Sequence, residues 1–151
     1  MKSKKHKIGI ISDTHGVLPY KVHEVFEGVD QIIHAGDIGN EDIILELETI
    51  APVTAVFGNT DGHAMRKKTK ERLDFTINGF DFIVTHFPLY FADDDVLTIR
   101  ISGHTHRPLN LKRRGSLLIN PGSAVFPRGE YNPSVASVSY THLTLPTKVS
   151  V

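Results

Sequence analysis

The first sixty residues alternate short apolar runs with segments of helical spacing, and this alternation limits the possible folds more than any other feature. Ile8 to Ser12, Gln31 to His34 and Val53 to Phe57 have the length and β-branched content of buried strands. Leu18 to Phe26 and Glu41 to Thr49 lie between them and are predicted as helices. Alternating strands and helices need parallel strands joined by right-handed crossovers. The N-terminal half is therefore expected to be α/β.

The pattern changes after residue 70, where extended segments follow one another. Asn78-Gly79 is a strong hairpin signal, and Arg114-Gly115-Ser116 separates a second pair of apolar runs. The expected strands are Arg72 to Ile77, Phe80 to Thr85, Val96 to Ser102, Asn110 to Arg113, Leu117 to Ile119 and Val135 to Tyr140. We expect this half to be antiparallel and to stack on the first sheet, with helices outside.

Composition indicates one globular domain without thiol chemistry. The chain has 151 residues, 40% of them hydrophobic, which suits one buried core. Lys plus Arg number 17 and Asp plus Glu number 17, so the formal net charge is zero. A balanced chain has no overall field for a polyanion, so nucleic acid is not expected as a general partner. The absence of cysteine excludes disulfide scaffolds, thiolate zinc sites, iron–sulfur clusters and cysteine nucleophiles.

Membrane segments and leader sequences are not expected. The apolar run Ile8 to Ile11 is too short for a signal-peptide core and is followed at once by the polar pair Ser12-Asp13. No segment approaches the roughly 18 apolar residues that a membrane span needs. The sequence therefore predicts a cytoplasmic protein with no membrane partner.

Seven potential metal ligands fall just past the ends of expected strands, where ligand sites assemble in α/β sheets. They are Asp13, His15, Asp37, Asn59, His86, His104 and His106. Their oxygen and imidazole donors suit hard or borderline divalent ions. Each residue also has a structural interpretation. A single histidine at a strand end is more often structural than a ligand. Ser12-Asp13 is also compatible with a helix cap, and Asn59 to Gly62 is compatible with a simple turn. The joint pattern at five successive strand ends favours metal binding, although the direction of each side chain stays open.

Other polar residues have separate interpretations. His34 is expected in the core or at a sheet edge, and His23 on an exposed helix face. His63 follows Asn59 in a polar turn, where a substrate-binding or proton-transfer role is the alternative to simple exposure. Arg107 and Arg128 are candidates for phosphate contacts, against the more usual reading of solvated surface arginines.

The motifs Asp13-Thr14-His15, Gly36-Asp37, Gly58-Asn59-Thr60-Asp61, Thr85-His86 and Gly103-His104-Thr105-His106, in this order, resemble the calcineurin-like metallophosphoesterase superfamily. The short length, Gly-His-Thr-His-Arg-Pro at 103–108 and Asn120-Pro121-Gly122-Ser123 are similar to its small bacterial and archaeal phosphodiesterase branch. The resemblance implies an α/β fold, a four-layer α/β/β/α sandwich of two mixed sheets flanked by helices. It also implies a metal-dependent phosphodiesterase acting on a small or non-specific phosphodiester.

The resemblance further implies two metal ions. Carried onto this chain, Asp13, His15 and His106 would hold the first ion, Asn59, His86 and His104 the second, and Asp37 would bridge both. A hydroxide shared by the two ions would then attack phosphorus in line. Manganese is the expected ion, with nickel, iron, zinc and magnesium as alternatives.

The chain departs from the family pattern at three places. Thr60 stands where many members have a histidine that assists the leaving group, so the general acid is unassigned. Thr60 and His63 are the predicted substrate contacts. The 87–95 loop is short, and its aromatic residues Phe87, Tyr90 and Phe91 could pack under the loop, form an interface or form a substrate wall. Residues 139–151 look like translated adapter or vector sequence, so the predicted domain covers residues 1–138.

Two alternatives to a phosphodiesterase remain at this point. The first is a catalytically weak metal-binding scaffold, as in a retromer subunit of similar architecture, but all seven ligand positions are intact here. The second is a phosphomonoesterase or nucleotide hydrolase, which would use the same ligands with a different pocket wall.

Overall fold

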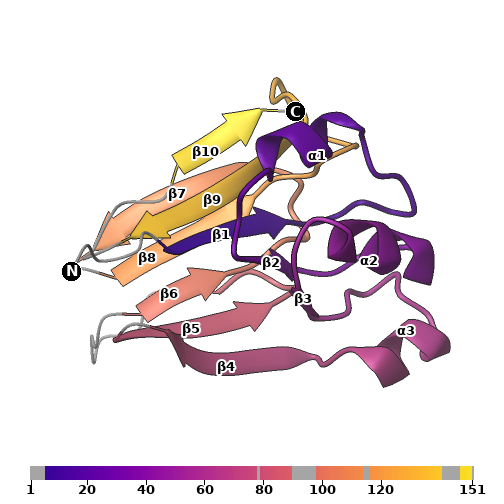
Figure 1. The fold of residues 1–151 in the computed structure, drawn as a ribbon, viewed down its shortest axis with the longest axis horizontal. Helices are drawn as coiled ribbons and strands as arrows, with labels where there is room; N and C mark the ends of the chain where they lie inside the picture. Colours follow the sequence, from indigo (N-terminus) through magenta and orange to yellow (C-terminus); the bar gives the residue numbers. More distant parts are fainter. Residues whose placement is uncertain (1–5, 78, 90–97, 114–115, 141–146, 151) are drawn as a thin grey trace.

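The computed structural model describes residues 6–77, 79–89, 98–113, 116–140 and 147–150, which form two sheets packed face to face (Figure 1). The first sheet has the strand order β10-β9-β1-β2-β3. Its strands are β1 (His6–Ile11), β2 (Gln31–His34), β3 (Val53–Ala55), β9 (Ser134–Tyr140) and β10 (Thr147–Ser150). β1, β2 and β3 are parallel, as the alternating pattern predicted, while β9 is antiparallel to both β1 and β10.

The second sheet has the order β4-β5-β6-β8-β7. Its strands are β4 (Arg72–Ile77), β5 (Phe80–Thr85), β6 (Thr98–Ile101), β7 (Pro108–Arg113) and β8 (Ser116–Pro121). Both predicted hairpins are present, but the expectation of an antiparallel half was wrong, because β5, β6 and β8 run parallel. Hairpin signals fix only the pairing within each hairpin, whereas β6 takes its neighbours from two different hairpins. The first two residues of the predicted strand from Val96 lie outside the described residues.

Three helices accompany the sheets in the described part of the chain: α1 (Lys21–Val25), α2 (Glu41–Glu48) and α3 (His63–Lys68). α1 is shorter than predicted, and α3 was not predicted. α2 begins after Asn40, whose backbone is extended, and Ile43 and Leu47, four residues apart, are buried. Residues 90–95 of the 87–95 loop, including Tyr90 and Phe91, lie outside the described residues, so the interpretation of this loop stays a prediction.

Two apolar clusters hold the layers together. Neighbouring residues on each strand face opposite sides, so Ile10 and Ile33 join the cluster between the sheets while Ile11 and Ile32 join the cluster under the helices. Phe82, fully buried and stacked on Phe75 at 5.1 Å between ring centroids, belongs to the first cluster. Burial of both faces explains why these strands are continuous apolar runs.

The fold class predicted from the sequence, two mixed sheets with flanking helices, is confirmed. The arrowheads of β1, β5 and β6 point in the same direction (Figure 1), so the loops that follow them lie at one end of the molecule. None of the helices in the described ranges has the length and apolarity needed to cross a bilayer. Residues 147–150 pair with β9, but a foreign origin of the 139–151 segment stays a prediction.

Candidate metal centre

The seven predicted ligands come from five loops, each of which follows a strand. Asp13 and His15 follow β1, Asp37 follows β2, Asn59 follows β3, His86 follows β5, and His104 and His106 follow β6. Backbone hydrogen bonds tie these loops together: Asp13 N donates to Gly36 O at 3.0 Å, and His15 N donates to Asp37 O at 2.9 Å. The loops after β1 and β2 are therefore cross-linked through their main chains. Gly103 N likewise donates to His86 O at 2.9 Å, which joins the loops after β5 and β6.

The backbone at most of these positions is left-handed. In the described residues, the non-glycine residues with positive φ are Asp13 (54°), His15 (45°), Asp37 (55°), His104 (71°) and His106 (59°). Each such conformation is unfavourable for a residue with a Cβ, by about 1–3 kcal/mol where the position is strained. Every one of the five is a predicted ligand, so the loops hold these side chains in directions that ordinary turns would not give.

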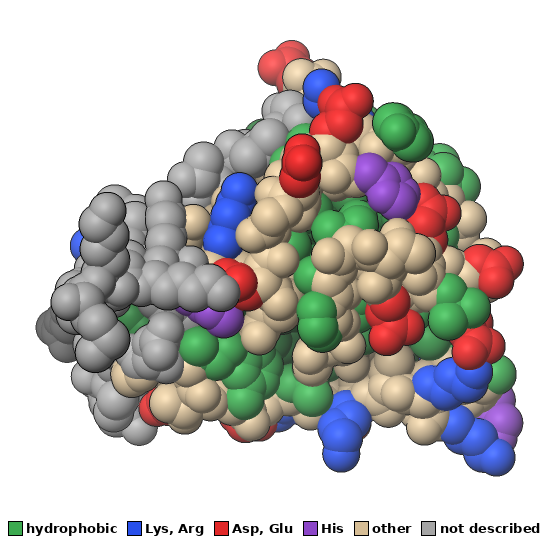
Figure 2. Space-filling view, in the orientation of Figure 1, with side chains coloured by type: hydrophobic (Ala, Val, Ile, Leu, Met, Phe, Trp, Pro, Cys, Tyr) green, Lys and Arg blue, Asp and Glu red, His purple; other side chains and the backbone are tan. Residues whose placement is uncertain are grey.

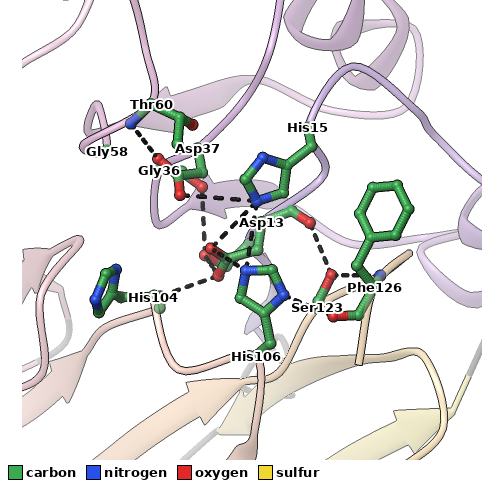
Figure 3. A network of polar contacts seen from close by, with 12 residues as sticks. Asp13, His15, Gly36, Asp37, Gly58, Thr60, His104, His106, Ser123 and Phe126 are labelled. Carbon is green, nitrogen blue, oxygen red and sulfur yellow. Dashed lines mark hydrogen bonds and ion pairs between the residues drawn. The ribbon is translucent and has the colours of Figure 1, made fainter. Parts of the chain in front are cut away.

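Asp13, His15 and His106 form the first of two groups whose ligand atoms lie within 4.8 Å of one another. Asp13 Oδ1 is 3.2 Å from His106 Nε2, and the Nε2 atoms of His15 and His106 are 3.4 Å apart (Figure 3). His106 Nδ1 donates to the carbonyl of Phe126 at 2.6 Å, so the opposite nitrogen, Nε2, faces the group. A backbone acceptor on one imidazole nitrogen is the usual way in which proteins orient a histidine ligand.

Asp37, His86 and His104 form the second group. His86 Nδ1 donates to the carbonyl of Ala35 at 2.8 Å, which leaves its Nε2 facing the group. Asn59 was predicted as a ligand of this group, and its Oδ1 lies 3.0 Å from His86 Nε2 and 3.2 Å from His104 Nδ1. The Asp-x-His pair thus stays within one group, whereas His104 and His106 separate into different groups.

Asp37 lies between the two groups. Its Oδ2 is 3.2 Å from His86 Nε2 of the second group and 3.7 Å from His15 Nε2 of the first. The other oxygen, Oδ1, accepts a hydrogen bond from Thr60 N at 2.9 Å, which fixes the carboxylate plane (Figure 3). This is the position in which one carboxylate oxygen reaches both groups.

The electrostatics of the cluster fit a cation. Asp13 Oδ1 is buried and accepts no hydrogen bond within the described residues. Burial raises the pKa of Asp13, against the lowering effects of Ser12, His86 and His106. For Asp37, burial opposes ionisation, but hydrogen bonds from His86 and Thr60 bring its pKa below the usual range. A carboxylate oxygen without a donor, buried among imidazole nitrogens, is the arrangement that a divalent ion completes.

The pKa of His86 is raised, although burial alone would lower it, because Asp37 and the Ala35 carbonyl accept hydrogen bonds from its ring. These contacts favour the protonated ring, whereas a histidine binds a metal ion through a deprotonated nitrogen, so the two compete at His86.

Two glycines are required by close approach to ligands. A Cβ on Gly58 would lie 2.1 Å from Asp37 Oδ1, and a Cβ on Gly103 would lie 2.7 Å from Asp13 Oδ2. Both contacts are far inside van der Waals distance, so a larger residue would displace the carboxylates.

Asp61 supports the site but was not singled out in the sequence, where it reads as part of a turn. It is buried, and its carboxylate accepts hydrogen bonds from Ile38 N at 2.9 Å, Gly39 N at 3.1 Å and Gly58 N at 2.8 Å. It therefore joins the loops after β2 and β3. In the sequence, the only indication of a role for Asp61 is its position two residues after the predicted ligand Asn59, and such spacing is common in turns.

His34 is a fully buried residue that links two of the site loops. Gly36 N donates to its Nδ1 at 3.1 Å, so its Nε2 carries the proton and lies 3.0 Å from Thr14 Oγ1. Burial, the largest influence, lowers the pKa of His34 to about 3. This agrees with the core location predicted from the sequence. His23 was expected to be exposed but is half-buried, and its Nε2 lies 2.7 Å from Glu46 Oε2.

His34 is expected to make stability depend on acid. Its pKa in the folded protein is about 3 against an ordinary value of 6.5, so between these values the unfolded chain binds the proton and the folded chain does not. The free energy of unfolding should therefore fall as pH decreases from 6.5 toward 3, by at most about 1.4 kcal/mol per pH unit from this group. Urea unfolding of the metal-free protein between about pH 7 and pH 4 measures this slope. His34→Gln should flatten it and His23→Gln should not; equal slopes in all three proteins would contradict the assignment.

The predicted substrate contacts Thr60 and His63 are both exposed. The backbone N–H of Thr60 donates a hydrogen bond to the carboxylate of Asp37. His63 is exposed at the start of α3 and lines a hollow with Asn40 and Lys68 that none of the seven ligands borders. Arg107 and Arg128 are exposed. Their roles in substrate binding stay predictions.

The sequence matches the calcineurin-like phosphoesterase superfamily domain over residues 7–142. The chain belongs to this superfamily. It is 40% identical over 139 residues to a probable metallophosphoesterase of Methanothermobacter thermautotrophicus, covering 80% of this chain and 78% of that protein. It is 37% identical over 139 residues to a phosphodiesterase of Methanocaldococcus jannaschii, covering 77% of this chain and 82% of that protein.

Solved structures agree with this assignment to the calcineurin-like phosphoesterases. A structure described as a novel archaeal phosphodiesterase superposes with a TM-score of 0.78 at 27% identity, covering 96% of this chain and 99% of that one. The chain is thus a metallophosphoesterase, as predicted, and its two groups of ligand atoms are candidate sites for the metal of this calcineurin-like phosphoesterase.

Proposed function

We propose that the protein hydrolyses phosphodiesters with two divalent ions held by the seven residues of the centre. The observation that carries the proposal is the position of Asp37 Oδ2, at 3.7 Å from His15 of one group and 3.2 Å from His86 of the other. In this assignment Asp13, His15 and His106 hold one ion, Asn59, His86 and His104 hold the other, and Asp37 bridges them. Manganese is our expected ion. The relative named as a phosphodiesterase supports a diester substrate.

When bound, such ions would activate water for in-line attack and offset the negative charge that gathers on the phosphoryl oxygens. The chain's own residues position these ligands beforehand. The backbone carbonyls of Ala35 and Phe126 fix the rings of His86 and His106, and Thr60 N fixes Asp37. Preorganised ligands need no rearrangement as the reaction proceeds.

No general acid is assigned. Thr60 occupies the position after Asn59, and its hydroxyl, unlike an imidazole, does not release a proton near neutral pH. A leaving group must then depart as an anion or take its proton from water. We therefore expect substrates whose leaving groups are already good, and His63 stays a predicted contact rather than an established proton donor.

The function is tested with protein stripped of metal by a chelator and then supplied with manganese. We expect bis-p-nitrophenyl phosphate to be hydrolysed only by the refilled protein, and faster than p-nitrophenyl phosphate, with two ions bound per chain by elemental analysis. Preference for the monoester would indicate a phosphomonoesterase. Absence of turnover from folded, metal-loaded protein would favour a scaffold role instead.

A further inference from the structure

A cavity of about 460 Å³ opens beside the second group of ligands. Its volume is within the range of small-molecule sites. The predicted ligands Asn59 and His86 form one side of it. Its surface is largely apolar. The apolar side chains of the lining are those of Phe57, Phe87, Pro88 and Leu89. The remaining lining residues are Gly58, Arg66, Glu71, Arg72 and Thr85. A molecule whose phosphate lies at the candidate metal centre could therefore place a substituent in this cavity.

Phe87 is the clearest sign of an unused contact surface. Its side chain is 54% exposed, although its ring lies 4.8 Å from the ring of His104 and 5.5 Å from that of His86, between centroids. A large exposed aromatic ring at the rim of a site gains free energy when an apolar group covers it.

A second planar surface belongs to the cavity lining. The guanidinium of Arg66 lies over the ring of Phe57, with 4.8 Å from its Cζ to the ring centroid. Arg66 Nε donates to the carbonyl of Asp61 at 2.7 Å, and an Nη atom donates to that of Asn59 at 3.4 Å, so the stack is tied to the loop that carries Asn59. Planar side chains in the lining, held by the loops that carry predicted ligands, suit contact with a planar group.

Figure 2 shows blue side chains gathered over α3, where Arg66, Lys67 and Lys68 form the last turn. The cavity also includes Arg72, but its Nε and one Nη atom donate to the carboxylate of Asp74, at 2.8 Å and 3.1 Å. The cavity lining also includes Glu71, so it carries charges of both signs, and its apolar residues do not favour a second charged group.

Resting on the proposed function, we infer that this cavity binds the ester group that stays on phosphorus and prefers a planar, apolar group there. In-line displacement sends the leaving group away from the attacking oxygen. A cavity at the side of the ligand groups therefore faces the ester group that is retained. Diesters that carry an aryl group at this position are the preferred class over diesters with a small alkyl group.

The test keeps the leaving group constant. Phenyl p-nitrophenyl phosphate and methyl p-nitrophenyl phosphate both release p-nitrophenolate, and each kcat/KM is divided by the rate of hydrolysis in hydroxide. We expect the phenyl ester to be preferred by roughly tenfold or more, the usual discrimination by an apolar pocket. Phe87→Ala should remove most of this preference. Saturation-transfer NMR on zinc-loaded protein should show contact with the rings of diphenyl phosphate, reduced in the same variant.

The matched control is Tyr20→Ala. Tyr20 is 77% exposed, and its ring lies 5.5 Å from the ring of His23, which is not one of the seven predicted ligands. The preference should persist in this variant. Equal rates for the two esters, or a preference that survives in Phe87→Ala, would overturn the inference while leaving diester hydrolysis established. Failure to hydrolyse either ester would overturn the proposed function and this inference with it.

Discussion

Asp37→Asn is expected to lower kcat/KM for diester hydrolysis by roughly 10³-fold or more, since stabilisation by a metal centre is worth several kcal/mol. Asparagine has nearly the same shape, but it replaces the negative oxygen that lies 3.2 Å from His86 and 3.7 Å from His15 with a neutral group. The variant should also bind fewer ions. Steady-state kinetics with added manganese, together with elemental analysis of the purified protein, measures both effects.

Asp42→Asn is the matched control for this substitution. Asp42 is exposed in the first turn of α2, where a neutral side chain should change the free energy of unfolding by a few tenths of a kcal/mol and leave hydrolysis intact. Circular dichroism of both variants checks that they fold. Near-normal turnover by a folded Asp37→Asn protein would show that the reaction does not depend on a carboxylate shared by the two groups.

Asp61→Ala is expected to lower the free energy of unfolding by about 3 kcal/mol or more, because each buried donor left without an acceptor typically costs about 1–3 kcal/mol. Three backbone N–H groups, those of Ile38, Gly39 and Gly58, lose their acceptor at once. Since two of them adjoin Asp37 and Asn59, metal affinity should fall as well. Urea unfolding and calorimetric titration of metal into the protein measure the two effects.

Asp81→Ala is the matched control, because it removes a carboxylate that does not join the two loops. Asp81 is exposed on β5 and accepts a hydrogen bond from Thr76 Oγ1 at 2.8 Å, so its removal should alter stability by less than about 1 kcal/mol. If Asp61→Ala were no less stable than Asp81→Ala, the carboxylate of Asp61 would not be what holds the two loops together.

The sequence was most informative where a local pattern determines structure. Each predicted ligand follows a strand, and parallel strands bring their ends to one edge of a sheet, so the convergence of Asp13, Asp37 and Asn59 could be predicted without contacts. The division of His104 and His106 between two groups could not, since it depends on left-handed backbone at both residues. Local patterns contain no information about such loop conformations.

Long-range pairing and supporting contacts were the parts that sequence reasoning missed. β6 lies between β5 and β8, and no turn motif in the sequence predicts this pairing. α3 is six residues long with Met65 as its buried residue, so it lacks the repeated apolar spacing that identifies a helix. Asp61 is recognised as a support only when the backbone donors of another loop are seen beside it.

The left-handed backbone at five of the seven predicted ligands has a consequence for how such a protein changes over generations. Glycine adopts this conformation without strain, so replacing one of these residues by glycine would relax the main chain while deleting a ligand. At these positions glycine would favour the stability of the fold, whereas metal binding requires the side chain that is present. A lineage no longer selected for hydrolysis would gain stability by discarding these ligands.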